Sequence, residues 1–248
     1  MGAQAKLNRD RKKAAAAKDH GGVCVAFIHP GDTSAFFTTS MLAMMLYDGH
    51  TERHITGLVN EWSSANVSAA RNKLTALFCD EKPDADWLLF IDADMGFEHD
   101  ALERLMRVAD PEKAPIVGGL CFGAQADRLF PTIYQVVRVE SGLRVNRTHE
   151  YERDAVVQVA ATGSAFLLIH RRVVEAMREA KLSKAFPWFQ ETELDGDPVG
   201  EDITFCLRAG MLGFPVFVDT RVKVGHHKSW LLTEDVFEKQ QREAAGDG

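Results

Sequence analysis

The sequence predicts a single α/β domain with a mostly parallel central sheet flanked by helices. Strand-like and helix-like segments alternate three times within about ninety residues, which is typical of βαβ units with right-handed crossovers. The strand-like segments are apolar at consecutive positions, as expected for strands buried on both faces of a parallel sheet. With 248 residues and 46% hydrophobic side chains, the chain can fill one large core.

The first half of the chain carries this alternation most clearly. VCVAFIHPG is an apolar run closed by Pro-Gly, a pattern that indicates a buried strand followed by a turn. The amphipathic segment at 68–79 predicts a helix with these residues facing inward: Ala69, Leu74, Leu77 and Phe78. In chain order we expect a strand at 23–31, a helix at 38–47 ended by Asp48-Gly49, a strand at 54–60, a helix at 68–79, a strand at 87–91 and a helix at about 100–108.

The second half is less regular and predicts a smaller, mixed region. Its polar and charged stretch at 141–154 is expected to be a mobile loop over a site. The expected elements are strands at 114–122, 132–139 and 156–159, a strand that passes into a helix over 163–177, a helix at 200–214 stopped at Gly213, and a final strand pair at 215–228.

Composition limits where the protein works and what it binds. We expect tails at 1–20 and 236–248 around one domain at 21–235, whose first half at 21–120 has the βαβ alternation typical of nucleotide-binding folds and whose second half at 121–235 is less regular. No apolar run is long enough to span a membrane and the N-terminus lacks an apolar signal region, so we expect a cytoplasmic protein. Its four widely spaced cysteines favour buried free thiols over disulfides or a zinc site. The net charge of −7 argues against a surface that clamps a polyanion everywhere.

The stretch WLLFIDADMGF places two aspartates at the end of a buried strand. Ligands bind beyond the carboxyl ends of parallel strands, and Asp92 and Asp94 occupy such an end. On an extended chain, residues two apart point to the same side, so both carboxylates could face one object. Two like charges this close repel unless a cation lies between them, and Mg²⁺ or Mn²⁺ suits oxygen ligands. The alternative is that the motif only caps a turn; its place after a strand and before glycine favours a metal.

Further motifs along the chain resemble a known enzyme family. They are AlaArgAsn at 70–72, the DAD motif, ThrGlySer at 162–164, GlyGluAsp at 200–202 and GlyHisHis at 225–227. In this order and spacing, over roughly residues 23 to 230, they resemble the metal-dependent glycosyltransferases of the GT-A fold, closest to the family 2-like group. The resemblance implies a Rossmann-like sheet and transfer of a sugar from a nucleotide-diphosphate sugar, with a UDP-sugar favoured, to an acceptor hydroxyl. It also implies a nucleotide-binding half at 21–120 and an acceptor and catalytic half at 121–235.

The resemblance also implies a metal site, with Mn²⁺ or Mg²⁺ on the donor diphosphate. It assigns Asp94 as a direct metal ligand and Asp92 as a ribose or water-mediated metal contact. A late histidine often completes the metal shell in this family, which favours His226, with His227 as its rival. A metal ion there would stabilise the charge that gathers on the leaving diphosphate.

Four other residues are candidates for catalysis or nucleotide binding. Arg71 could add a cation and Asn72 a hydrogen bond near the nucleotide, although both could simply begin a solvated helix. By resemblance, Asp202 is the base that takes the acceptor proton, and its neighbour Glu201 contacts the acceptor. The alternative for the acidic pair is that it only stabilises the start of a helix through the helix dipole.

Two positions are expected to shape the donor site. Gly163 permits close approach of the backbone to a sugar, unless it serves packing alone. Pro30 lies in HisProGly after the first strand, where the family holds the nucleotide base. The second predicted strand ends in ValAsnGlu rather than in the short acidic residue typical of the family, which leaves the identity of the base open.

Other functional classes remain possible from the sequence. A haloacid dehalogenase-type phosphatase also uses DxD, but on its first strand and with Thr or Val two residues after the second aspartate. A nucleotidyltransferase would carry a glycine-rich phosphate loop after the first strand, which HisProGlyAspThrSer is not. A non-catalytic sugar- or calcium-binding module is a further alternative. The acceptor could be a protein, a glycan, a small molecule or a modified DNA base.

Overall fold

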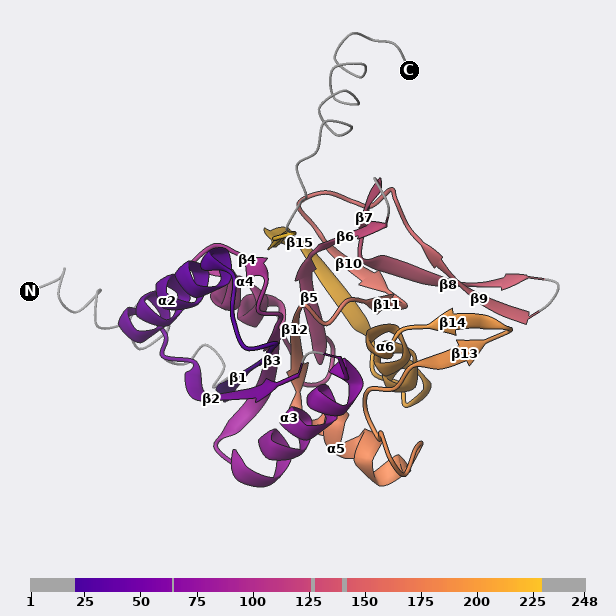
Figure 1. Cartoon of the computed structure of the whole chain (residues 1–248), viewed down its shortest axis with the longest axis horizontal. Helices are drawn as coiled ribbons and strands as arrows, with labels where there is room; N and C mark the ends of the chain where they lie inside the picture. The colour runs from indigo at the N-terminus through magenta and orange to yellow at the C-terminus, as the bar shows by residue number, and fades with distance from the viewer. Residues whose placement is uncertain (1–20, 64, 126–127, 140–141, 229–248) are drawn as a thin grey trace, which may run out of the picture.

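A computed structural model describes residues 21–228 apart from 64, 126–127 and 140–141 (Figure 1). The predicted tails at 1–20 and 236–248 lie outside the described residues. In the part described, a seven-stranded sheet has the order β10-β15-β5-β12-β3-β1-β2. Its strands are β1 (Gly22–His29), β2 (Ile55–Trp62), β3 (Ala85–Ile91), β5 (Ile116–Leu120), β10 (Val156–Val159), β12 (Phe166–His170) and β15 (Val216–Lys223).

The sheet is mostly parallel, which confirms the predicted fold class. β1 runs parallel to both β2 and β3, and β15 runs parallel to β5. β12 lies antiparallel between β3 and β5, and β10 is an antiparallel edge strand. The helices of the described chain are α2 (Ala35–His50), α3 (Val67–Glu81), α4 (Ala101–Val108), α5 (Arg171–Ala180) and α6 (Glu201–Met211).

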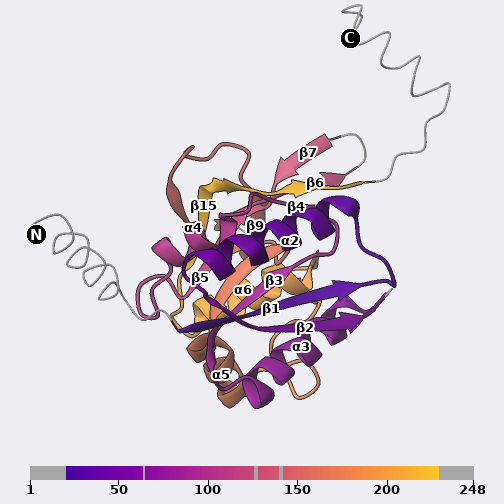
Figure 2. The ribbon, with the colours of Figure 1, turned by 90° about the vertical axis from the view of Figure 1, so that its left-hand side faces the viewer.

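Helices cover both faces of the sheet, so each face has its own core layer. α2 and α4 pack on one face with side chains such as Met44 and Leu105, while α3, α5 and α6 pack on the other with side chains such as Phe78 and Phe205. Figure 2 shows α2 on one side of β1 and β3, with α3 and α5 on the other. This explains why β3 is apolar at consecutive positions, since every residue of the strand except Asp86 is buried.

Shorter strands build the remaining region. β4 (Met95–Gly96) pairs with β16 (Gly225–His226), which brings the GlyHisHis motif beside the segment that follows the DAD motif. β8, β9, β13 and β14 extend together on the right of Figure 1. The strands not yet given are β6 (Phe122–Gln125), β7 (Arg128–Pro131), β8 (Ile133–Val139), β9 (Gly142–Arg147), β11 (Ala161–Thr162), β13 (Thr192–Leu194) and β14 (Asp197–Val199).

The predicted mobile loop at 141–154 is wrong in its first part. β9 pairs antiparallel with β8, with Val145 opposite Val136. Val145 packs against the core, but most other residues of β9 are exposed and polar. A strand that buries so few side chains has a loop-like composition, which is why the sequence suggested a loop.

Helix boundaries differ from the prediction because of local caps. α2 begins three residues earlier than predicted because the Ser34 hydroxyl accepts a hydrogen bond from the Phe37 amide at 3.0 Å. In α3, Ala69 and Leu77 were expected to face inward but are only partly buried. The buried face instead includes Arg71 and Asn72, which places polar groups inside the protein beneath the strand ends.

Arg171, the first residue of α5, joins α3 to the sheet. Its guanidinium donates hydrogen bonds to the carbonyls of Phe78 at 3.2 Å, Cys79 at 3.3 Å and Ala85 at 2.8 Å, and it also contacts the Lys82 carbonyl. These carbonyls belong to the last turn of α3, to the segment after it and to the first residue of β3, and the Phe78 carbonyl also accepts a hydrogen bond from the Lys82 amide at 3.3 Å.

Replacing Arg171 with methionine is therefore expected to lower the free energy of unfolding by about 3 kcal/mol, because several carbonyls lose a charged donor. Chemical denaturation followed by circular dichroism measures this. Arg172→Met is the matched control, because that side chain is more exposed and forms a surface ion pair with Glu112; a clearly smaller loss is expected. Equal losses in the two variants would contradict the role given to Arg171.

Two further expectations concern the thiols and the membrane. The four cysteines are free, as predicted, and three of them are buried. Within the described residues, no helix combines the length and apolar character that a membrane crossing requires.

Candidate functional site

A cavity of about 700 Å³ lies where three parallel strands end. β1, β2 and β3 stop at its rim, and the first turn of α2 forms another wall. This is the position at which open α/β sheets bind ligands. The cavity is lined by Ile28, Pro30, Asp32, Thr33, Ser34, Ala35, Ser63, Val67, Arg71, Asp92, Ala93, Asp94, His227 and Lys228.

Both aspartates of the DAD motif line this cavity, but for a different reason from the one predicted. The Met95 amide donates to the Asp92 carbonyl at 3.1 Å, so the motif is a turn and not an extended continuation of β3. The Asp92 amide still donates to the Ala165 carbonyl at 3.0 Å, which fixes the start of the turn at the sheet. The two carboxylates therefore take different partners.

Asp94 meets the last described residues of the chain. His226 Nε2 lies 2.9 Å from Asp94 Oδ2, and the Lys228 ammonium donates to the same oxygen at 3.2 Å. Burial alone would raise the pKa of Asp94, but the hydrogen bond with His226 and the two nearby charges outweigh it and hold that pKa below its usual value. The hydrogen bond with Asp94 also raises the pKa of His226.

The same geometry tests whether a divalent ion suits this point. His226 Nδ1 lies 3.0 Å from the Phe122 carbonyl, which can only accept, so Nδ1 carries a proton. Nε2 then faces the Asp94 carboxylate and needs either a second proton or a cation between them. Histidines that bind metals commonly donate their other ring N–H to a carbonyl in this way. An imidazole nitrogen and a carboxylate oxygen directed at one point fit Mn²⁺ or Mg²⁺ with open positions for phosphate oxygens and water.

The protein supplies few ligands at this point. Among residues 21–228 as described, no group of three or more His, Cys, Asp or Glu side chains is close enough to hold a metal ion. The structure thus brings Asp94 and His226 together, whereas Asp92 turns to Arg71. Of the two rival histidines, His226 directs its ring at Asp94, while the His227 amide donates to the Asp94 carbonyl at 2.8 Å and its ring contacts Phe36.

Arg71 lies between Asp92 of the DAD motif and Glu201 of the predicted catalytic pair. Its guanidinium donates to Asp92 Oδ1 at 2.9 Å and to the Ser164 carbonyl at 3.4 Å, and Nε lies 3.5 Å from Glu201 Oε1. The side chain is only 5% exposed. Burial disfavours the charge, but Asp92 and Glu201 outweigh it and raise the pKa of Arg71. Arg71 is therefore a buried cation among carboxylates, and not a solvated residue at the start of a helix.

Asp202 lies in the first turn of α6 beside this cation. Burial and the charge of Glu201 raise its pKa to about 6, although Arg71 acts in the opposite direction. The Asp202 carboxylate accepts a hydrogen bond from the Ile203 amide at 2.7 Å. A carboxyl group with a pKa near neutrality can accept a proton during a reaction and release it afterwards.

Asn72 does not reach the cavity, which corrects its predicted contact with the nucleotide. Its amide nitrogen donates to the carbonyls of Ser68 at 2.7 Å and Phe189 at 2.6 Å, and its oxygen accepts from the Trp188 amide at 3.2 Å. Both ends of the side chain are thus used within the protein. Asn72 holds the 188–189 segment against α3.

The two positions expected to shape the donor site, Pro30 and Gly163, have different surroundings. Pro30 lines the cavity, and its carbonyl accepts a hydrogen bond from the Trp62 indole at 3.1 Å. Gly163 lies beside the predicted base, since a Cβ on this residue would be 3.5 Å from Asp202 Oδ2. That spacing is ordinary van der Waals contact, as is the 3.5 Å to Thr132 Cβ, so the fold itself does not require glycine here.

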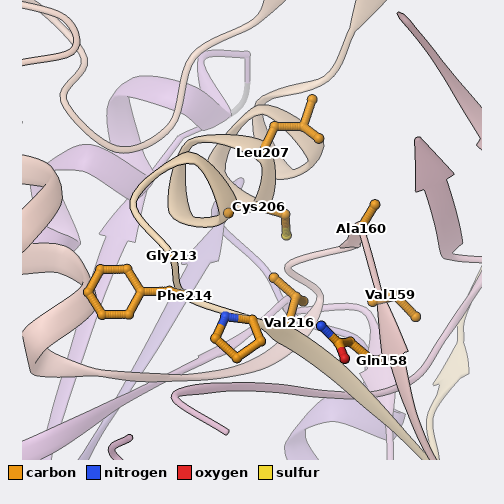
Figure 3. A pocket seen from close by; sticks show the side chains of 10 residues that line it. Gln158, Val159, Ala160, Cys206, Leu207, Gly213, Phe214 and Val216 are labelled. Atoms are coloured by element: carbon orange, nitrogen blue, oxygen red, sulfur yellow. The ribbon is translucent and has the colours of Figure 1, made fainter. Parts of the chain in front are cut away.

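A second cavity, of about 370 Å³, lacks such chemistry. It lies between the end of α6 and strands β10 and β15 (Figure 3). In the described part of the chain, its only ionisable lining side chain is Cys206, and burial raises the pKa of that thiol to about 12. The first cavity is therefore the candidate site.

Lys228 lines the cavity and contacts Asp94, but the sequence motifs did not include it. It directly follows GlyHisHis, and its contact with Asp94 becomes visible only when β16 pairs with β4. A lysine beside two histidines has no distinctive spacing, so no sequence pattern selects it. The ion pairs of Arg71 with Asp92 and Glu201 were likewise missed, because they join residues 21 and 130 positions apart.

Comparisons with known proteins agree with the fold described above. No protein-family model matches the chain, and no curated protein matches its sequence. The crystal structure of GalNAc-T7 with UDP, GalNAc and Mn²⁺ matches with a TM-score of 0.54 and 10% identity. The match covers 84% of this chain and 44% of that one, so the chain spans less than half the length of GalNAc-T7 as crystallised.

Two other solved structures match more loosely. A197 from STIV has a TM-score of 0.47 and 17% identity, over 86% of this chain and 97% of that one. A glycosyltransferase involved in the glycosylation of the major capsid of PBCV-1 has a TM-score of 0.34 and 10% identity, over 66% and 68%. Both TM-scores are below 0.5. At 10% identity the likeness to GalNAc-T7 concerns the fold alone, and the chain has a GT-A-like glycosyltransferase fold.

Proposed function

We propose that this chain is a glycosyltransferase that moves a sugar from a nucleotide-diphosphate sugar to an acceptor hydroxyl. The observation that carries the proposal is the cavity at the ends of β1, β2 and β3, where Asp92 and Asp94 face a ligand site and His226 meets Asp94. A UDP-sugar is the favoured donor, because the neighbour of the same fold was crystallised with UDP and Mn²⁺.

The donor would lie along the cavity from Pro30 to Asp94. Pro30 would contact the base, Asp92 would contact the ribose or a metal-bound water, and Asp94 and His226 would hold Mn²⁺ or Mg²⁺. When bound, this ion supplies Lewis-acid stabilisation of the negative charge on the diphosphate. Asp92 is held in place for its role by the buried Arg71 guanidinium.

Asp202 would act on the acceptor side. Its carboxylate takes the proton of the acceptor hydroxyl while the acceptor oxygen forms its bond to the anomeric carbon. The bond between that carbon and the phosphate oxygen breaks, and the nucleoside diphosphate leaves with the electron pair. Glu201 would contact the acceptor, and Gly163, whose Cβ position lies 3.5 Å from Asp202 Oδ2, would permit close approach of the backbone to the sugar.

We also propose that one half of the domain binds the donor and the other half binds the acceptor. Residues 21–120 would bind the donor, because all the cavity-lining side chains except His227 and Lys228 belong to this half. Residues 121–235 would bind the acceptor, because Asp202 and the β8–β9 and β13–β14 hairpins belong to that half.

Calorimetric titration tests the donor site. UDP, GDP and their sugars are titrated into chelator-treated protein with and without Mn²⁺. We expect one nucleotide to bind only with Mn²⁺, and Asp94→Asn to abolish that binding because the metal loses its carboxylate ligand. Glu98→Gln, an exposed carboxylate just after β4, is the control and should bind as the wild type does. Absence of binding by every nucleotide, with the fold intact, would exclude the proposed function.

A further inference from the structure

Lys228 and His226 contact the same oxygen atom of Asp94, the proposed metal ligand. Its ammonium lies 3.2 Å from Asp94 Oδ2, and His226 Nε2 lies 2.9 Å from the same atom. The lysine side chain is 47% exposed and the Asp94 side chain is 37% exposed, so this contact borders the cavity and is open to exchange.

A divalent ion and this ammonium cannot both remain on Asp94 Oδ2. Two positive charges within about 4 Å repel strongly when they are partly shielded from water. The lysine charge is carried on a flexible four-carbon chain, so it can move several ångströms without any change in the backbone. Binding of a metal ion to Asp94 would therefore release Lys228 into the cavity.

The other permanent cation of the cavity wall is not available in the same way. The Arg71 guanidinium is engaged by Asp92 and the Ser164 carbonyl, and Glu201 lies beside it, with 5% of the side chain exposed. Among the described residues that line the cavity, Lys228 is thus the permanent cation that is free to follow an incoming anion. A nucleoside diphosphate brings several negative charges, and one divalent ion neutralises only part of them.

We propose that Lys228 is an exchangeable cation that holds Asp94 in the absence of metal and binds the donor diphosphate once a divalent ion occupies Asp94. This inference rests on the proposed function and adds a coupling to it. Because the metal must displace Lys228, the lysine weakens metal binding to the empty protein. Because the displaced lysine then contacts the diphosphate, it strengthens nucleotide binding to the metal-loaded protein. By linkage, metal and nucleotide each increase the affinity for the other.

The two effects have opposite signs in one variant, which makes the test specific. In Lys228→Met, we expect Mn²⁺ alone to bind about twofold to fivefold more tightly, the range for loss of an exposed ion pair. With saturating Mn²⁺, we expect UDP to bind about tenfold more weakly, because a charge-assisted hydrogen bond is lost. Both affinities are measured by calorimetry on the full chain, and uridine serves as a ligand without phosphates.

Two further variants complete the design. Lys223→Met removes an exposed lysine of β15 and should change neither affinity. Lys228→Arg keeps the charge and should retain most of the UDP affinity. Unchanged Mn²⁺ and UDP affinities in Lys228→Met, beside a wild type that binds both, would overturn this inference and leave the proposed function intact. A wild type that binds neither Mn²⁺ nor a nucleotide would overturn both.

Discussion

Replacing Asp202 with asparagine is expected to lower the rate of sugar transfer by about 10²- to 10⁴-fold, because the acceptor hydroxyl loses its base. Nucleotide binding should change little, since Asp202 is not among the residues lining the donor cavity. The rate is measured as nucleoside diphosphate released at saturating donor and acceptor. Glu52→Gln, an exposed carboxylate in the turn after α2 that does not line the cavity, is the control and should retain full activity.

The pH dependence gives the same prediction a second readout. The pKa of Asp202 is about 6, and the base must be ionised to accept a proton. Transfer by the wild type should therefore rise with pH through about 6 and level off above it, and Asp202→Asn should lose this inflection. A profile without an inflection near 6, or a variant within twofold of the wild-type rate, would remove Asp202 from the role of base.

Replacing Arg71 with methionine is expected to destabilise the fold strongly. The guanidinium is 5% exposed and balances Asp92 and Glu201, so its loss leaves partly buried carboxylates without their counter-charge. We expect the free energy of unfolding to fall by about 3 kcal/mol. Denaturant unfolding measures this change at pH 7.

The control for Arg71→Met is Lys73→Met, in the same helix, and the second readout is the pKa of Asp202, which lies beside Arg71. Lys73→Met removes a 60% exposed ammonium that pairs with Glu61 and should lower stability by less than about 1 kcal/mol. Since the charge of Arg71 lowers the pKa of Asp202, its removal should move the inflection of the transfer rate above pH 6. Arg71→Met as stable as Lys73→Met, or an inflection that does not move, would contradict the buried-cation assignment.

The sequence predicted the parts of the fold that depend on local patterns. Runs of buried residues such as those of β3 report a strand covered on both faces, and turn residues such as Gly213, with φ of +85°, mark where a helix stops. β9 escaped prediction because its side chains are mostly exposed, so composition could not distinguish it from a loop. What identifies β9 is its hydrogen-bonded register with β8.

The candidate site shows a similar limit. The aspartates at the end of β3 and the acidic start of α6 were recognisable from their places beside predicted elements. The pairing of Asp92 with Arg71, and of Asp94 with His226 and Lys228, depends on contacts between distant segments. Asn72 shows the reverse error, because a polar residue beside Arg71 appeared functional in sequence but is used entirely within the protein.

Pulsed electron paramagnetic resonance of Mn²⁺ bound to the protein with UDP tests the central proposal most directly. We expect the bound ion to show magnetic coupling to a ¹⁴N nucleus from His226 and to ³¹P nuclei from the diphosphate. His226→Gln should remove the nitrogen coupling and keep the phosphorus coupling. Bound Mn²⁺ without phosphorus coupling, or with a nitrogen coupling that persists in His226→Gln, would contradict a metal held between this histidine and a donor diphosphate.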